Sequence, residues 1–343
     1  MAADGDYQTF EAGDVVLQSG VTFPSLRLAY KTYGKLNAAK DNVILYPTSF
    51  GAQHYDTEWL IASGGALDPN TYFIIIPNLF GNGLSSSPSN TRDLFGDAPF
   101  PAISYHDAVE VQRRLLVEQF GISRIALVYG WSMGGMQAYH WAALHPDMVA
   151  RAAVVCGSAR CSPYNHVFLD AVKAALTADP AFRNGRFVEK PVAGLRAMGR
   201  IYAGWAMSYE FYRDEVWREQ GFVSQEDYLA ATWDTAFAHR DADNLLAQIA
   251  IWQGGDISRC AAFDGDLDRA LAAITARMLL MPGQTDRYFD WRDNESEVPK
   301  LVNARSAELR PIPSVHGHRA GNPIRIPADR DFINAHVAAL LNS

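Results

Sequence analysis

One stretch, residues 125–144, constrains the fold of this 343-residue chain more than any other. It begins with a short apolar and β-branched run from Ile125 to Tyr129, which is typical of a buried strand. The run ends in Gly130-Trp-Ser-Met-Gly134 and continues without a spacer into a helical pattern. A Gly-x-Ser-x-Gly sequence between a strand and an amphipathic helix is typical of a nucleophile elbow, a sharp and strained turn. We therefore expect Ser132 to be a nucleophile.

The glycines around Ser132 support this interpretation. A Cβ at Gly130, Gly134 or Gly135 is expected to strike the opposite arm of the turn. The helix that starts here would also direct its N–H groups and the positive end of its dipole at the reaction site. The alternative is a serine that caps an ordinary helix, which leaves the crowded glycines without an explanation.

Composition excludes several classes of function. The net charge of −8 argues against nucleic acid or an anionic membrane surface as a partner. The amino terminus has neither a basic segment nor an apolar run, and no stretch approaches the length of a membrane span, so we expect a cytoplasmic protein. Three cysteines without metal-ligand spacing predict reduced thiols and no metal site, and Cys156 is expected to pack in the core. Residues 81–83 lack the third glycine of a dinucleotide-binding loop.

Strand and helix patterns alternate through the first half of the chain. Residues 14–18 and 26–33 predict an antiparallel pair of strands, and the apolar runs 42–46 and 72–76 predict strands covered on both faces. Between and after these runs we expect a helix over 56–66, a long surface loop over 81–101 and a helix over 105–119. This alternation indicates an α/β fold with a parallel sheet and right-handed crossovers.

The alternation is interrupted after one more strand, residues 151–155. Residues 162–269 show helical patterns with many charges, which favours a helical cap over the carboxyl edge of the sheet. We therefore assign 1–161 and 270–343 to the core and 162–269 to the cap. Further strands are expected over 277–283 and 307–311, followed by a final helix over 327–341.

A nucleophilic serine needs a base and a carboxylate that fixes the tautomer of the base. In an α/β fold with this elbow, the acid and then the histidine follow the serine, each after a strand. Asp286 is the first acidic residue after the strand that follows the cap, with Asp290 and Asp293 as rivals. The last strand leads to His316 and His318, between which order and spacing do not decide.

The reaction also needs two N–H donors for the developing oxyanion. One is expected to be the amide of Met133, the residue after the nucleophile. The other is expected from the loop that follows residues 42–46, where Ser49 is the candidate donor.

These residues resemble the homoserine O-acetyltransferase branch of the α/β-hydrolases. The resemblance rests on Ser132-Met-Gly-Gly-Met-Gln137, on Ile75-Ile-Pro-Asn78 before a glycine-rich loop, and on the pair Gly317-His318. It implies a mostly parallel eight-stranded sheet, with helices on both faces and a cap inserted after the sixth strand. It also implies that His318 is the base, Asp286 the acid and Ser49 an oxyanion donor, and that a homodimer forms through the cap.

The chain departs from that family near the site. Homoserine acyltransferases usually carry glycine where this chain has Trp131, and Asp-Ala-Phe-Leu where it has Arg319-Ala-Gly-Asn322. Their cap arginine, which holds the carboxylate of the amino acid, has no counterpart in register, although Arg196 and Arg200 lie near. An aromatic residue beside the nucleophile favours a less polar ester. The expected substrate contacts are Phe50, Trp131, Arg200 and Trp205.

We therefore expect a serine carboxylic-ester hydrolase for acetyl or other short acyl groups, acting on a small-molecule ester without a cofactor. The alternative is an O-acetyltransferase that moves acetyl from acetyl-CoA, as co-substrate, to homoserine or a related alcohol. A non-catalytic binding protein of the same fold is a third hypothesis. It is disfavoured because all three triad positions are occupied by suitable residues.

Overall fold

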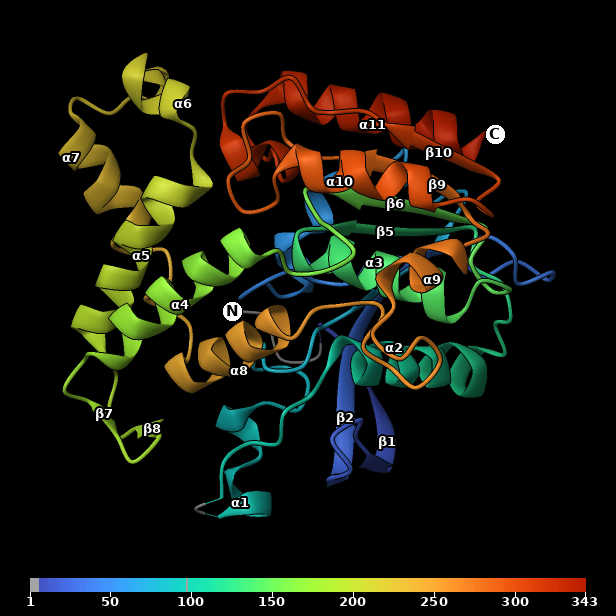
Figure 1. The fold of residues 1–343 in the computed structure, drawn as a ribbon, viewed down its shortest axis with the longest axis horizontal. Helices are drawn as coiled ribbons and strands as arrows, with labels where there is room; N and C mark the ends of the chain where they lie inside the picture. The colour runs from blue at the N-terminus through green and yellow to red at the C-terminus, as the bar shows by residue number, and fades with distance from the viewer. Residues whose placement is uncertain (1–5, 97) are drawn as a thin grey trace.

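The computed structural model describes residues 6–96 and 98–343 (Figure 1). The prediction that no signal peptide is present falls partly on residues 1–5, which lie outside the described part of the chain. Among the described residues we find no helix whose length and apolar character would let it cross a lipid bilayer. Cys156, Cys161 and Cys260 are all unpaired thiols, and Cys156 is buried as expected.

Eight strands form the main sheet, in the order β1-β2-β4-β3-β5-β6-β9-β10. The pairs β1·β2 and β2·β4 are antiparallel, and all the other neighbouring pairs in this sheet are parallel. This confirms the predicted fold class, including the antiparallel start. The strands are β1 (Gln8–Val16), β2 (Thr22–Tyr33), β3 (Val43–Leu45), β4 (Phe73–Pro77), β5 (Leu127–Trp131), β6 (Arg151–Val155), β9 (Arg277–Met281) and β10 (Ser306–Leu309).

The central strands are apolar throughout because both faces of the sheet are covered. In β4, Ile75 packs into one hydrophobic cluster, whereas Ile74 and Ile76 pack into a second cluster on the opposite face. The first face is covered by α2 (Tyr105–Arg114), α3 (Met133–Leu144) and α10 (Trp291–Glu297). The second face is covered by α11 (Pro327–Leu341), which Figure 1 shows along the outer strands.

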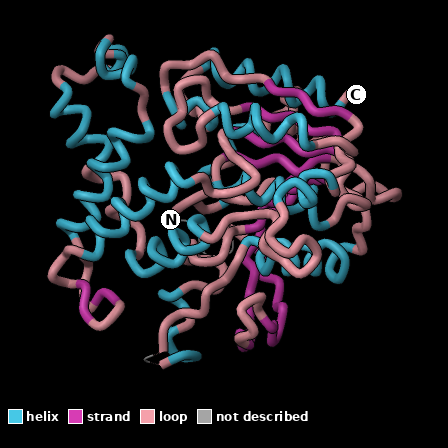
Figure 2. Tube along the Cα trace, in the orientation of Figure 1, coloured by secondary structure: helices cyan, strands magenta, loops and turns pink. Residues whose placement is uncertain are grey.

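The chain between β6 and β9 is mainly helical, as predicted, and in Figure 2, drawn in the orientation of Figure 1, the helices α4 to α8 are grouped beside the sheet, whereas α9 lies apart from them. Residue 269, where we place the end of the cap, lies inside α9, so the boundaries of the cap stay a prediction. The elements of this segment are α4 (Pro163–Thr177), the hairpin β7 (Phe182–Arg183) and β8 (Arg186–Phe187), α5 (Val192–Ala206), α6 (Tyr209–Arg213), α7 (Gln225–Tyr228), α8 (Ala242–Gln253) and α9 (Leu267–Ala272).

Two local predictions in the first half of the chain were wrong. Residues 56–66 do not form an α-helix but short 3₁₀ turns, His54–Asp56 and Glu58–Leu60, and the chain then bends through Gly64 at a positive φ of 78°. The 81–101 loop is buried in its first part, because the hydroxyls of Ser85 and Ser86 accept hydrogen bonds from the backbone of β2. The loop also contains the short helix α1 (Arg92–Phe95).

The helix after the elbow is not amphipathic, contrary to expectation. Every residue from Met133 to Ala143 in α3 is buried. The helix contacts β5 and β6 on one side and α2 on another. A helix covered on all sides has no polar face, so its periodicity carries no amphipathic signal.

Candidate active site

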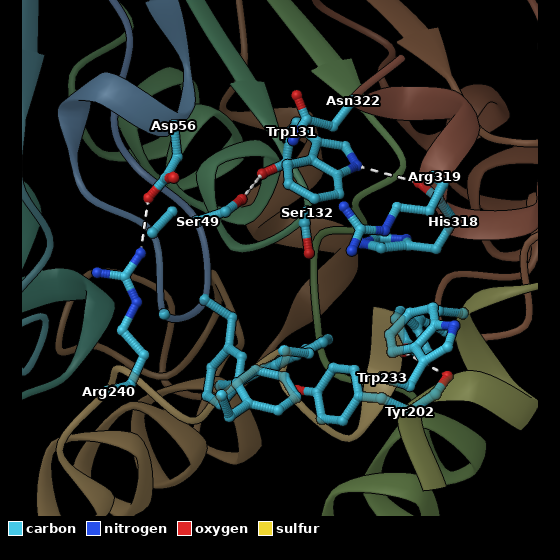
Figure 3. Close-up of a pocket in the computed structure, with 18 of the residues that line it drawn as sticks. Ser49, Asp56, Trp131, Ser132, Tyr202, Trp233, Arg240, His318, Arg319 and Asn322 are labelled. Carbon is cyan, nitrogen blue, oxygen red and sulfur yellow. Dashed lines mark hydrogen bonds and ion pairs between the residues drawn. The ribbon is translucent and has the colours of Figure 1, made fainter. Parts of the chain in front are cut away.

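Ser132 occupies the turn between β5 and α3 with φ 58° and ψ −124°. A non-glycine residue rarely adopts a positive φ, and such backbone persists only where the surroundings hold it. Here the Ser132 amide donates to the Val155 carbonyl at 2.9 Å, and the Ser132 carbonyl accepts from the Met136 amide at 3.0 Å. The strained turn expected from the sequence is therefore present. Its serine borders a cavity (Figure 3).

The elbow glycines allow close approaches of the backbone. A Cβ on Gly130 would lie 1.9 Å from the Gly134 carbonyl oxygen, on the opposite arm of the turn, as expected. A Cβ on Gly135 would lie 3.2 Å from the Gly130 oxygen and 3.3 Å from Val154. The expectation was wrong for Gly134, whose Cβ would instead meet the Pro47 carbonyl oxygen at 2.6 Å, in the loop after β3.

His318 and Asp286 come together at the carboxyl edge of the sheet. His318 Nδ1 lies 2.7 Å from Asp286 Oδ2, and both side chains are buried. Asp286 follows β9, and its other oxygen, Oδ1, accepts hydrogen bonds from the amides of Tyr288 at 2.8 Å and Phe289 at 3.3 Å. The carboxylate is thus fixed by the backbone and holds one ring nitrogen of His318, which leaves Nε2 for a second partner.

The rival residues lie in other environments. Asp290 accepts a hydrogen bond from the Arg292 amide and caps α10, and Asp293 lies within that helix. His316 contacts the Ser314 hydroxyl at 3.3 Å and lies 3.9 Å from Asp329, so it does not face Asp286. Burial lowers the pKa of His316. Of the two histidines that the sequence left open, His318 is the one that contacts Asp286.

Aromatic rings enclose the His318 imidazole. Its centroid lies 4.5 Å from that of Tyr288, 5.0 Å from Trp131 and 5.7 Å from Phe289. Trp131 Nε1 also donates to the His318 carbonyl at 3.3 Å. These contacts limit rotation of the imidazole, so the ring is held in place before any ligand binds.

Ser132 and His318 line one cavity of about 230 Å³. The helical segment between β6 and β9 supplies much of the apolar wall, from Tyr202, Trp233, Phe237 and Trp252. In Figure 3 Tyr202 and Trp233 lie across the cavity from Ser132. This volume is below the ~300–1,000 Å³ of pockets for drug-sized ligands, and it suits a small molecule.

The two predicted oxyanion donors both lie beside the nucleophile. Met133 is the first residue of α3, so its N–H has no carbonyl one turn earlier to bond. Ser49 is buried, lines the cavity, and donates its hydroxyl to the Trp131 carbonyl. This contact ties the loop after β3 to the elbow. The donor roles themselves stay predictions.

Of the four predicted substrate contacts, Phe50 and Trp131 line the cavity, but Arg200 and Trp205 do not. Arg200 Nη2 bonds Asp234 Oδ2 at 2.8 Å and Glu226 Oε1 at 2.6 Å. Trp205 packs against Tyr164 and Phe168. Tyr202 and Ala206 of α5 face the cavity, and a helix that points these i and i+4 residues inward turns positions 200 and 205 away.

Sequence reasoning missed the charged groups of the cavity. Asp56 and Arg240 pair at 2.8 Å, and His239 lies next to them in the lining. Arg319 also lines the cavity, with its guanidinium carbon 5.4 Å from the centre of the Trp233 ring. The sequence already shows that Arg319 departs from the residue usual in homoserine acyltransferases. Only the fold shows that its side chain enters the site.

A buried carboxyl group supports the loop behind the elbow. Glu297 Oε1 accepts from the Ala159 amide at 2.8 Å, and its Oε2 accepts from the Tyr139 hydroxyl at 2.7 Å and Asn294 Nδ2 at 2.8 Å. Burial raises the pKa of Glu297 to about 7. The Ala159 loop includes Gly157, where a Cβ would lie 3.1 Å from the Ser132 carbonyl oxygen. Glu297 therefore stabilises backbone that contacts the nucleophile turn.

Within residues 6–96 and 98–343, two groups of side chains are close enough to coordinate an ion, although the sequence showed no metal-ligand spacing. The first is Cys156, Asp286 and His318, in which the acid and the imidazole already bond each other. Burial raises the pKa of the Cys156 thiol well above its usual value, which favours the protonated form. The second group is Asp6, His54 and Glu58.

The chain is similar to several known proteins. Residues 42–316 match the family model described as the alpha/beta hydrolase fold. The chain is 38% identical to an ethyl acetate hydrolase of Pseudomonas veronii, over 99% of this chain and 96% of that protein. A solved acetylester hydrolase from Corynebacterium glutamicum superposes with a TM-score of 0.93 and 35% identity, over 99% of this chain and 97% of that one. A homoserine O-succinyltransferase of Methylibium petroleiphilum is 32% identical, over 89% of this chain and 86% of that protein.

Proposed function

The chain belongs to the alpha/beta hydrolase fold family, as an esterase-type member of the branch that includes homoserine acyltransferases. From this premise we propose that it is a serine carboxylic-ester hydrolase for short acyl groups, with Ser132, His318 and Asp286 as its triad. The observation that carries the proposal is the buried 2.7 Å contact between His318 and Asp286, at the cavity that Ser132 also lines.

The reaction follows from the chemistry of these groups. Ser132 Oγ attacks the ester carbonyl, while His318 Nε2 takes the hydroxyl proton and passes it to the leaving alcohol. Asp286 holds the Nδ1 proton and stabilises the imidazolium that forms. The amides of Met133 and Ser49 are proposed to stabilise the oxyanion. Water then attacks the acyl-enzyme, with His318 as the base, and no cofactor is required.

The size of the cavity and the named activities of similar proteins both support a short acyl group. The cavity of about 230 Å³ is walled by Phe50 and the rings of the cap, which leaves little room for a long chain. Two similar proteins are named as an ethyl acetate hydrolase and an acetylester hydrolase. We therefore propose acetyl esters as the first substrates to test.

Acyl transfer is the second candidate, because the chain is also 32% identical to a homoserine O-succinyltransferase. If this chain were an O-acetyltransferase, an acceptor alcohol such as homoserine would replace water, and acetyl-CoA would be the donor. The cap arginine that we considered as a carboxylate clamp, Arg200, is bonded to Asp234 and Glu226 outside the cavity. That position favours hydrolysis.

The two candidates are separated by two assays on purified protein. p-Nitrophenyl acetate should be hydrolysed without an added acceptor. Acetyl-CoA with homoserine should release no free thiol above background. Robust CoA release would instead establish the transferase. Ser132→Ala should lower either activity by several orders of magnitude, and an unchanged rate would exclude Ser132 as the nucleophile.

Assembly and location are also proposals. We propose a cytoplasmic homodimer that forms through the cap and has no nucleic-acid or membrane partner, in line with the net charge of −8. A solution mass equal to one chain would contradict the dimer.

A further inference from the structure

Arg319 differs from the other arginines of this protein that lie over aromatic rings. Four such arginines each also pair with a carboxylate: Arg114 with Glu118, Arg213 with Asp214, Arg218 with Glu215, and Arg292 with Asp290. Arg319 lies over Trp233, but among the described residues no carboxylate forms an ion pair with it. Its donors are therefore available to a ligand.

The guanidinium of Arg319 belongs to the same cavity as the nucleophile. Arg319 follows His318 directly in the 3₁₀ turn Gly317–Gly321, and it lines the cavity together with Ser132. Figure 3 shows its side chain directed into the cavity, beside His318. The contact with the Trp233 ring restrains the planar head without occupying its N–H groups, so the donors are held in place before a ligand binds.

The other charged groups of the cavity compensate each other. Asp56 carries the only carboxylate among the described residues of the lining, and its Oδ2 lies 2.8 Å from Arg240 Nη2. Burial, more than the nearby Arg240, lowers the pKa of His239, so this imidazole is neutral at pH 7 and above. Arg319 thus adds a positive charge that no carboxylate of the described lining pairs, in a protein whose net charge is −8.

We propose that Arg319 forms an anion subsite, and that the preferred substrates are esters that also carry a carboxylate. A guanidinium binds a carboxylate through two parallel N–H···O bonds. Such bonds are stronger in a cavity walled by aromatic rings than in water. The carboxylate belongs to the acyl part or to the alcohol part of the ester. This inference rests on the proposed esterase function and adds a substrate class to it.

Two matched pairs of esters test the subsite. Ethyl hydrogen succinate and ethyl succinamate differ by a carboxylate or an amide in the acyl part. Acetoxyacetate and acetoxyacetamide differ in the same way in the alcohol part. We expect kcat/KM to favour the carboxylate in at least one pair, by about 10- to 100-fold. The pair that shows the preference locates the anion on the acyl side or on the alcohol side.

Variants then assign the preference to Arg319. Arg319→Gln should lower kcat/KM for the carboxylate ester more than for its amide partner and so remove the preference, whereas Arg319→Lys should keep part of it. Arg292→Gln is the matched control. It also loses an arginine that lies over a tryptophan, Trp291, but on the exposed surface, and it should keep the full preference.

The outcomes separate this inference from the proposed function. If p-nitrophenyl acetate is hydrolysed but neither pair shows a preference for the carboxylate, only the anion subsite is overturned. A uniform loss on all four esters in Arg319→Gln also overturns it and indicates a packing role against Trp233. If no ester is hydrolysed, the proposed function fails. Calorimetric titration of Ser132→Ala with ethyl hydrogen succinate and with acetoxyacetate, with and without Arg319→Gln, then still decides the subsite: binding of either ester that depends on Arg319 supports it, and equal binding of both overturns it.

Discussion

The indole of Trp131 lies against the imidazole of His318, with ring centroids 5.0 Å apart and planes inclined by 31°. Its Nε1 also donates to the His318 carbonyl at 3.3 Å. Gly321, in the same turn as His318, allows this approach, because a Cβ there would come within 2.4 Å of the indole. Trp131 therefore restrains His318, the proposed base, although the two are 187 positions apart in the chain.

Trp131→Gly should lower kcat for p-nitrophenyl acetate by about 10- to 100-fold, because small displacements of a catalytic group cost rates of this order. Trp131→Phe keeps a ring against His318 but loses the indole donor, and a smaller loss is expected. Steady-state kinetics of the two variants checks this. If kcat stays constant in Trp131→Gly and only KM rises, Trp131 is a substrate contact and not a positioning residue.

Asp286→Asn should lower kcat by about 10⁴-fold, the order seen when a triad carboxylate becomes an amide. The amide can donate to His318 Nδ1, which would leave the proton on Nε2 and prevent the ring from accepting from Ser132. The rate with p-nitrophenyl acetate is the measurement. Asp290→Asn, which changes the rival carboxylate at the cap of α10, serves as the control and should keep the rate near wild type. A loss below tenfold in Asp286→Asn would point to another acid.

The sequence predicted the strands and helices whose first and last residues are determined by neighbouring residues in the chain. The strand 151–155 and the helix 327–341 agree with the structure to the residue. Apolar residues fill the strand, while Pro327 at the first position of the helix and Asp329 in its first turn favour the observed start. The local sequence pattern does not identify which histidine faces Asp286. His316 and His318 are equivalent in spacing, and only the resemblance, and then the contact with Asp286, distinguishes them.

The sequence could not predict contacts that depend on how distant segments dock. Arg200 was expected in the site because it lies near the place of the family's cap arginine, whereas in the folded chain Tyr202 faces the cavity and Arg200 pairs with Glu226. The burial of Ser85 was missed for a related reason, since its hydroxyl replaces a strand partner for β2 only in the folded protein. From the sequence, Arg319 is only a departure from a family pattern. The folded structure is needed to show that its side chain enters the cavity without a carboxylate partner among the described residues.

Gly130→Ala should destabilise the protein by roughly 3 kcal/mol or more, because the new Cβ would overlap the Gly134 carbonyl oxygen, 1.9 Å away. Gly204→Ala is the matched control. Gly204 lies in α5 with nothing within 4 Å of its Cβ position, so alanine should stabilise the helix by about 0.5–1 kcal/mol. Urea unfolding of both variants measures the difference. Equal stabilities would mean that the elbow relaxes without cost.

Glu297 should make stability depend on pH in a defined window. Burial raises its pKa from 4.5 to about 7 in the folded state. Between these values the folded protein keeps a proton that the unfolded chain releases, so the free energy of unfolding falls as pH rises from about 4.5 to 7. The shift corresponds to a loss of up to about 3 kcal/mol across this window.

Glu297→Gln removes this titration. It also replaces one acceptor of the Ala159, Tyr139 and Asn294 contacts with a donor, so the variant should be less stable than wild type at pH 5. The deficit should then shrink as pH rises to 8, because only wild type loses stability through Glu297. Urea unfolding at pH 5, 6, 7 and 8 measures the deficit. Glu295→Gln, on the exposed side of the same helix, should follow the wild-type curve. A deficit for Glu297→Gln that stays constant from pH 5 to 8 would show that this carboxyl group has the same pKa in the folded and unfolded chains.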